Sequence, residues 1–576
     1  MYQINLSYDN AFSELLSDLE QRYGKEIFEI EGIGSQLDIS AFSKNFFSNK
    51  QVSDASIDEN ANVSENCIIT YKKEATKPIY KLNSLYILWR LLRKDYGTSI
   101  ANSIIEKQIN GELYLNDAWM VISPYCFNYS CIDIINKGLP MVKKIKSHPP
   151  KYLFSFKSQL EQFIILAANS TLGATGIADL LLCMSYYVKN IIETQSDGHF
   201  HFRSEDDCWI YVRETLASLI YTLNQPMRAS ESPFTNVSIY DDYFIEESKQ
   251  LYIFPDLSQP DTQIVKKLQK IFLDVMNSEL SRTPFTFPVT TACFSIDKEN
   301  NIKDEEFARF IAEENQKFGF INIFMGDTSL LSSCCRLVSD NSNGYLNSIG
   351  GSSSKIGSLS VCTINLPRIT YITKTEEEFF TKLEEQIRHT GKINNCRRKM
   401  IQRKIDEGYM PLYTYGFMDL GKQYSTVGIN GMYEAMLELG YDISTPIGLE
   451  FAKKLASFIS DQTNKLQKTY NTPHNCEVVP GESASVKLAK KDKLLGLNTK
   501  YIIYQNQFFP LVADMDILDR IKIQGQLDGK FSGGSIMHVN VENNVPIENM
   551  VELIKICAKR GVRYFALNYN IQVCEN

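Results

Sequence analysis

Two adjacent cysteines, Cys334 and Cys335, are the residues best suited to chemistry in this sequence. They stand in LLSSCCRLVSDNSNG, residues 330–344, between small polar residues and Arg336, in a segment with neither a helical nor a strand period. This composition predicts a loop that displays thiols. Alternatively, both cysteines are buried structural residues. A zinc site is disfavoured because adjacent cysteines lack a spacer and no Cys/His cluster stands nearby.

A second thiol site lies in GELYLNDAWMVISPYCFNYSCIDIINKG, residues 111–138. A strand-like run leads into Pro124-Tyr125-Cys126, so we expect Cys126 near the end of a strand. Cys131 follows at a spacing that is again poor for zinc. An ordinary buried role is the alternative for both cysteines.

A candidate phosphate site lies in VVPGESASVKL, residues 478–488, where Pro-Gly-Glu-Ser precedes a helical run. The first backbone N–H groups of a helix have no partner within it and carry the positive end of its dipole. Gly481, Glu482 and Ser483 could therefore bind a phosphate. The alternative is a capped helix without a ligand.

The composition is that of a globular protein without broad affinity for nucleic acids. Of 576 residues 44% are hydrophobic, and the formal net charge of -8 argues against DNA or RNA as partners. No run is long and apolar enough for a membrane span, and the N-terminus lacks the pattern of an export signal. Thirteen irregularly spaced cysteines in such a chain predict reduced thiols and no disulfide framework. We therefore expect a cytoplasmic protein.

Long helical stretches separated by short strands must position these residues. The polar segment 48–66 predicts a linker between an N-terminal extension, residues 1–66, and a large domain, residues 67–576. Apolar spacing predicts helices over 81–109, 154–169, 176–194, 206–224, 261–280, 304–318, 375–407, 446–470 and 547–560. Strand-like runs lie at 112–115, 321–325, 359–366 and 562–569. The long helical spacers favour parallel pairing and an α/β class, with about ten strands closing into a barrel.

Six dispersed segments resemble class III, or anaerobic, ribonucleoside-triphosphate reductases. They are SPFTNVSIYD (232–241), SSCCRL (332–337), VCTINLPRIT (361–370), TVGINGMYEA (426–435), EVVPGESASVKLAKKDK (477–493) and FSGGSIMHVN (531–540). The resemblance extends from about residue 56 to residue 576.

The resemblance implies a ten-stranded α/β barrel of the glycyl-radical enzyme type, with surrounding helices and a central finger loop. In this family a glycyl radical on a C-terminal loop oxidises a finger-loop cysteine to a thiyl radical, which abstracts the 3'-hydrogen of the ribose. An iron-sulfur activating enzyme that uses S-adenosylmethionine installs the glycyl radical. The resemblance also implies ribonucleoside triphosphate substrates, dNTP and ATP effectors, and a homodimer.

The resemblance assigns roles to individual residues. The radical cysteine, directly before the arginine of the finger loop, is Cys335; Arg336 is then a loop-positioning residue and Cys334 a neighbour or relay. The second active-site cysteine, the hydrogen-atom donor during loss of the 2'-hydroxyl, matches Cys126, with Cys131 as the fallback. The turn at 481–483 then binds the substrate phosphates.

Two positions in the sequence bear on the reductant. Formate-using members carry Met two positions before the radical cysteine and Asn shortly before NLPRI, where this chain has Ser333 and Ser358. The resemblance therefore argues against formate. Asn365, the nearest amide on the same run, is expected either to face the substrate or to cap the end of a strand.

Family members continue past the last predicted strand with a zinc module and then the radical glycine. Cys574 resembles the first zinc ligand, and its partners are not among residues 1–576. Either a second polypeptide supplies the radical loop, or the printed sequence is a piece of a longer chain. By itself the chain is then expected to show no turnover and no glycyl-radical signal.

Two other functions stay open at this point. Enzymes that resemble pyruvate formate-lyase also use adjacent finger-loop cysteines, although the segments SPFTN, NLPRI and FSGGSIMHVN favour the reductase. A non-catalytic nucleotide-binding protein that has lost its radical machinery is the other alternative, and the presence of both Cys335 and Cys126 disfavours it.

Overall fold

The computed structural model describes most of the chain. The described residues are 7–33, 39–48, 67–142, 145–228, 231–283, 285–326, 330–333, 337–340, 355–479, 481–497, 499–510, 513, 515–541 and 545–569. Within these ranges, none of the helices combines the length and the apolar character that crossing a bilayer requires. The predicted linker lies almost wholly outside the described residues, so a domain boundary at residue 66 stays a prediction.

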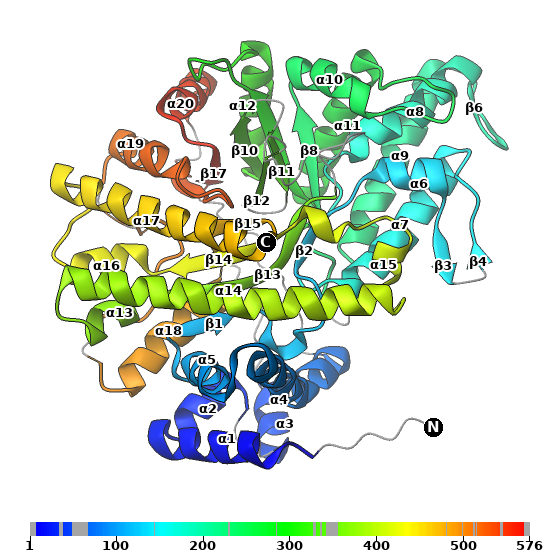
Figure 1. Cartoon of the computed structure of the whole chain (residues 1–576). Helices are drawn as coiled ribbons and strands as arrows, with labels where there is room; N and C mark the ends of the chain where they lie inside the picture. The colour runs from blue at the N-terminus through cyan, green and yellow to red at the C-terminus, as the bar shows by residue number, and fades with distance from the viewer. Residues whose placement is uncertain are drawn as a thin grey trace.

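Two sheets, each built on a path of five strands, form the centre of the molecule (Figure 1). The first runs β15 (His474–Val478), β14 (Gln423–Asn430), β13 (Gly357–Asn365), β2 (Cys126–Asn128) and β5 (Thr175–Gly176), with β1 (Leu113–Leu115) also on β13. The second runs β16 (Met537–Val541), β17 (Tyr564–Tyr569), β10 (Ile321–Gly326), β9 (Val289–Ser295) and β8 (Asn236–Tyr240). Most neighbouring strands are parallel, as predicted, whereas β13–β2 and β10–β17 are antiparallel.

Backbone hydrogen bonds join the two sheets at both edges. On one side, the N–H groups of Thr175 and Ile177 donate to the carbonyls of Phe234 and Asn236, which links β5 to β8. On the other side, Gly533 N–H donates to the carbonyl of Cys476, and Glu477 forms a bridge with Gly534 just before β16. The ten strands of the two paths thus follow one another in a ring, in which these bonds and the one bridge connect two separate sheets.

Helices surround this ring (Figure 1). Their bounds are α1 Asn10–Tyr23, α2 Lys25–Glu31, α3 Ile39–Ser48, α4 Ile68–Tyr96, α5 Thr98–Asn110, α6 Cys131–Lys137, α7 Leu153–Ser170, α8 Leu180–Thr194, α9 Glu205–Leu223, α10 Asp242–Ser248, α11 Thr262–Leu280, α12 Glu305–Phe318, α13 Leu366–Ile372, α14 Glu376–Asp406, α15 Pro411–Thr414, α16 Met432–Glu438, α17 Pro446–Tyr470, α18 Glu482–Leu494, α19 Ile517–Asp528 and α20 Ile547–Arg560. Short hairpins are β3 (Pro140–Val142) with β4 (Ile145–Lys146), β6 (Ser196–Asp197) with β7 (Phe200–His201), and β11 (Leu330–Ser333) with β12 (Leu337–Asp340). In Figure 1 helices α1 to α5 gather at one end of the molecule, where α5 contacts β1 and α2 contacts α18.

Most predicted helices begin and end within a few residues of the observed ones, because their apolar faces pack on the sheets. Two predictions need correction. The run 81–109 is two helices, α4 and α5, because Gly97, at φ +88°, ends one and begins the next. The run 176–194 begins only at Leu180, because Thr175 and Gly176 pair with β2 instead.

Candidate active site

Cys126 is the first residue of β2, which confirms the expectation that it lies near the end of a strand. Its thiol is nearly buried, with 8% of the residue exposed, and its sulfur accepts a hydrogen bond from the N–H of Ala174 at 3.2 Å. Gly173 makes this close approach feasible. A Cβ atom at position 173 would lie 2.3 Å from the sulfur, so the neighbouring chain must be glycine there for the thiol to keep its place.

Polar side chains continue on the strands beside Cys126. Ser358 on β13 is the direct cross-strand partner of Cys126, and its hydroxyl lies 2.8 Å from the hydroxyl of Thr426 on β14. Ser358 is one of the two positions, with Ser333, at which the sequence departs from the pattern of formate-using reductases. The structure therefore places that departure beside the candidate hydrogen-atom donor.

Cys131, the fallback for the donor, lies in a different setting. It is the first residue of α6, and its backbone N–H donates to Asp179 Oδ1 at 3.0 Å. Burial first, and then the nearby Asp179 carboxylate, raise the pKa of the Cys131 thiol well above its usual value. Cys131 thus belongs to the core between helices and strand ends.

The predicted phosphate turn does begin a helix. Gly481 is the N-cap of α18, and the N–H of Ser485 donates to the carbonyl of Gly481 at 2.8 Å. The Ser485 hydroxyl accepts from Asn430 Nδ2 at 2.9 Å, which ties the start of α18 to the end of β14. The turn therefore lies at the carboxyl ends of two parallel strands, β14 and β15, where α/β proteins commonly bind ligands.

A cavity of about 460 Å³ lies beside this turn. Its lining includes Ser483 and Lys487 from one face of α18, together with Lys81, Tyr114 and Trp119. Ser483 is exposed, and Lys487 is partly exposed one helical turn later. The Ser483 hydroxyl near the start of α18 and the Lys487 ammonium group thus open onto one space, and such groups suit an anion. The lining also includes carboxylates, those of Glu29, Glu31, Glu74 and Asp117.

The N-terminal region holds α18 through a buried charge cluster. Glu31, at the end of α2, accepts from Lys491 of α18 and from Lys81 of α4, each at 2.6 Å. Gln108 Nε2 also donates to Glu31, at 2.8 Å. Burial would raise the pKa of Glu31, but the ammonium groups of Lys491 and Lys81 outweigh it and lower the pKa to about 2.

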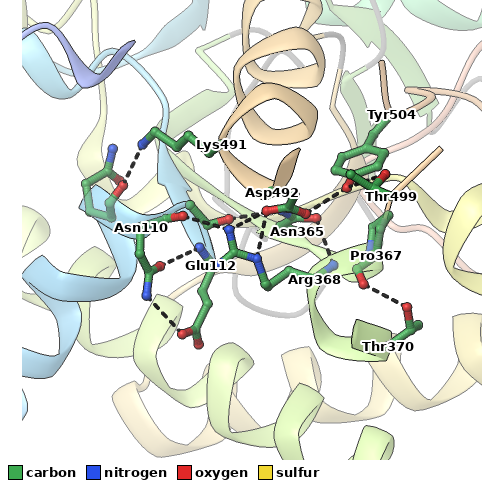
Figure 2. A network of polar contacts seen from close by, with 12 residues as sticks. Asn110, Glu112, Asn365, Pro367, Arg368, Thr370, Lys491, Asp492, Thr499 and Tyr504 are labelled. Atoms are coloured by element: carbon green, nitrogen blue, oxygen red, sulfur yellow. Dashed lines mark hydrogen bonds and ion pairs between the residues drawn. The ribbon is translucent and has the colours of Figure 1, made fainter. Parts of the chain in front are cut away.

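Asn365 belongs to a second buried network (Figure 2). Its Oδ1 accepts from the N–H of Arg368 at 3.2 Å and so caps α13, while its Nδ2 donates to Asp492 Oδ2 at 3.1 Å and to the Gly111 carbonyl at 3.0 Å. Arg368 forms an ion pair with Asp492, which also accepts from the Tyr504 hydroxyl at 2.7 Å. Of the two roles expected for Asn365, these contacts are those of a cap.

Comparison with known proteins decides the family. A family model described as anaerobic ribonucleoside-triphosphate reductase matches residues 80–576. The chain belongs to this family. Crystal structures of the anaerobic ribonucleotide reductase from Thermotoga maritima are similar over 100% of this chain. One, in complex with dATP and CTP, has 35% identity, a TM-score of 0.87 and 93% of its chain covered. Another, with dATP bound in the specificity site, has 35% identity, a TM-score of 0.86 and 94% of its chain covered.

Curated protein sequences gave no match. The predicted family, fold and reaction of an anaerobic ribonucleoside-triphosphate reductase are confirmed: the chain is an enzyme that reduces ribonucleoside triphosphates, and its family uses a glycyl radical and nucleotide effectors. The alternative of a pyruvate formate-lyase-like enzyme is not supported, because the match to the reductase model covers most of the chain.

Several of the predicted site residues lie outside the described residues. These are Cys334, Cys335 and Arg336, and also Cys574. Strands β11 and β12 flank positions 334–336 and pair antiparallel. The loop prediction for 330–344 is therefore wrong at 330–333 and 337–340. Each strand has four residues, which is too few for the alternation of its side chains to be recognised in the sequence. Within the described residues, no group of three or more His, Cys, Asp and Glu side chains could hold zinc.

Sequence reasoning missed several residues that contact or neighbour the predicted site residues. Gly173, Thr426 and Asp492 carry no local motif, and each matters through a residue distant in the chain. Thr426 and Asp492 fall within two of the segments that resemble the family, whereas Gly173 lies in none of the six.

Proposed function

We propose that this reductase acts on its substrate with Cys335 as the radical cysteine and Cys126 as the hydrogen-atom donor. Cys335 would remove the 3'-hydrogen of the ribose, and Cys126 would deliver a hydrogen atom while the 2'-hydroxyl leaves as water. The observation that carries the assignment of Cys126 is its place on the sheet: it faces Ser358 across β2 and β13, whereas Cys131 starts a helix. Cys334 and Arg336 would support the radical cysteine.

The substrate phosphates would bind at the start of α18, at Gly481, Glu482 and Ser483. Support comes from the helix N-terminus, its place after β15 and the adjacent cavity with Lys487. The proposal also includes nucleotide effectors such as dATP and an S-adenosylmethionine-dependent activating enzyme. It further includes a homodimer and a cytoplasmic location. A zinc module that includes Cys574 and a glycyl-radical segment also belong to it.

The test uses the chain under strictly anaerobic conditions with the activating enzyme, S-adenosylmethionine, a dithiol reductant, CTP and a polypeptide that carries the radical glycine. We expect dCTP to form. Cys335→Ala and Cys126→Ala should abolish dCTP formation and leave CTP binding within about twofold of the wild type. Cys131→Ala is the matched control and should retain turnover. Formation of dCTP by the Cys126→Ala variant would overturn the assignment.

A further inference from the structure

Two side-chain amides stand out because neither of their polar atoms is paired. Among the described residues, Asn236 and Asn475 are the only amides whose nitrogen and oxygen are both buried without a hydrogen-bond partner. Each residue is 0% exposed. An unpaired buried amide costs stability, because folding removes its bonds to water and supplies nothing in return. A ligand that supplies the missing partners explains why such groups are present.

Both amides lie on the inner face of the ring of strands. Side chains alternate along a strand. The neighbours of Asn236 and Asn475, Val237 and Cys476, belong to the main apolar core that the helices cover. Asn236 and Asn475 therefore point the other way, toward the inside of the ring.

Asn236 shares this inner face with Cys126. Cys126 and Asn128 are two residues apart on β2 and so project to the same side. A Cβ atom at Gly176, on the strand between β2 and β8, would lie 2.5 Å from Asn128 Oδ1 and 2.6 Å from Asn236 Oδ1. Asn236 is thus about one layer of side chains away from the Cys126 thiol.

Asn475 is connected to Cys126 across the sheet from the other direction. It is the cross-strand partner of Thr426, whose hydroxyl bonds to Ser358, the partner of Cys126. Strand β15 is five steps from β8 along the order β15-β14-β13-β2-β5-β8. Five steps are half of a ring of ten strands, so the two unpaired amides lie on opposite sides of the interior. Strand β2, which carries Cys126, lies between their two strands in this order.

We propose that Asn236 contacts the substrate by hydrogen bonds to its ribose hydroxyls, and that Asn475 contacts the same nucleotide from the opposite side. Each ribose hydroxyl is both a donor and an acceptor, and an unpaired amide offers one group of each kind. The 2'-carbon must approach Cys126 for the proposed hydrogen-atom transfer, which brings the hydroxyl edge of the ribose toward Asn236. The inference rests on the proposed function.

The experiment measures CTP binding and stability on the same variants of the full chain. Asn236→Leu and Asn475→Leu replace the amide nitrogen and oxygen by methyl groups and keep the branched shape of the side chain. We expect CTP affinity, measured by anaerobic equilibrium dialysis, to fall roughly 10- to 100-fold for each. The urea midpoint should stay the same or rise, because an unpaired buried group has been removed. If the asparagine had a merely structural role, its substitution would lower both the CTP affinity and the urea midpoint.

Thr235→Val is the matched control. The Thr235 hydroxyl is also buried and unpaired, but it lies on the opposite face of the chain from Asn236. This variant should bind CTP as the wild type does. For Asn236→Leu, either 2'-deoxy-CTP or 3'-deoxy-CTP should lose less than about threefold in affinity, because that analogue lacks the hydroxyl that the amide contacts.

The outcomes separate the two levels of the proposal. If the wild-type chain does not bind CTP, the proposed function fails. If the wild type binds CTP and both leucine variants bind it equally well, the amides are satisfied by water and this inference is overturned. Equal losses for CTP and both deoxy analogues, with a lower urea midpoint, would also overturn it.

Discussion

The Glu31 carboxylate and the Lys491 ammonium group form a buried ion pair at 2.6 Å although 460 residues separate them in the chain. Glu31 ends α2 and Lys491 lies in α18, so the pair connects the N-terminal helices to the helix that starts at the candidate phosphate turn. The family match begins only at residue 80. The N-terminal helices thus help to position a helix of the reductase body.

Replacing Glu31 by Gln should destabilise the protein by about 3 to 5 kcal/mol at pH 7, because it leaves Lys491 buried without its counter-charge. Urea unfolding measures this change. Asp18→Asn, which breaks the exposed pair with Arg22, is the control and should cost less than about 1 kcal/mol. Equal effects of the two substitutions would contradict the role of the buried pair.

The same ion pair predicts that the stability of the protein decreases at acidic pH. The folded-state pKa of Glu31, about 2, is below its ordinary value of 4.5. Its contribution to stability is therefore complete above about pH 4.5 and is lost as pH falls toward 2. The stability gap between wild type and Glu31→Gln should narrow over this range, and a gap that stays constant down to pH 2 would show the opposite.

Glu434 of α16 predicts the opposite dependence of stability on pH. It is 2% exposed and accepts the N–H of Gln505 at 3.1 Å, and burial raises its pKa from 4.5 to about 7. The folded state then binds the proton more tightly than the unfolded state, so stability falls as pH rises from about 4.5 to 7. Glu434→Gln should be more stable than wild type by roughly 3 kcal/mol at pH 8 and similar at pH 4.5. Glu552→Gln, on the exposed side of α20, should follow the wild-type curve.

Gly173 and Cys126 should be energetically coupled. Gly173→Ala forces a methyl group against the sulfur and should cost about 1 to 3 kcal/mol. In a Cys126→Ala background the sulfur is gone, so the same substitution should cost at least about 1 kcal/mol less. A double-mutant cycle by urea unfolding measures this difference, and additive effects would rule out the contact.

The cap at Asn365 can be separated from a role in the reaction. Asn365→Ala should destabilise the protein by about 2 kcal/mol, because it removes the cap of α13 and a partner of Asp492. Asn365→Ser keeps an acceptor for the Arg368 N–H and should lose less. If Asn365 is a cap, the serine variant retains dCTP formation; its loss in a stable variant would point to contact with the substrate.

The sequence alone determined the local elements and the family. Helical periods placed α17 and α20 at their observed ends, and the run predicted over 81–109 ends within one residue of the end of α5 at Asn110. The Pro-Gly-Glu-Ser turn started α18. Such features depend on residues a few positions apart, so one short segment is enough to predict them. The six dispersed segments were enough to name the family.

Only the tertiary structure decided which distant residues meet. The sequence does not reveal that Gly173 makes room for the Cys126 thiol or that Glu31 neutralises Lys491, because strand order and helix docking are set by burial summed over the whole chain. Nor does it reveal that Asn236 and Asn475 lack partners. Whether a polar group is satisfied depends on every neighbour that folding brings to it, and most of those neighbours are far away in the sequence.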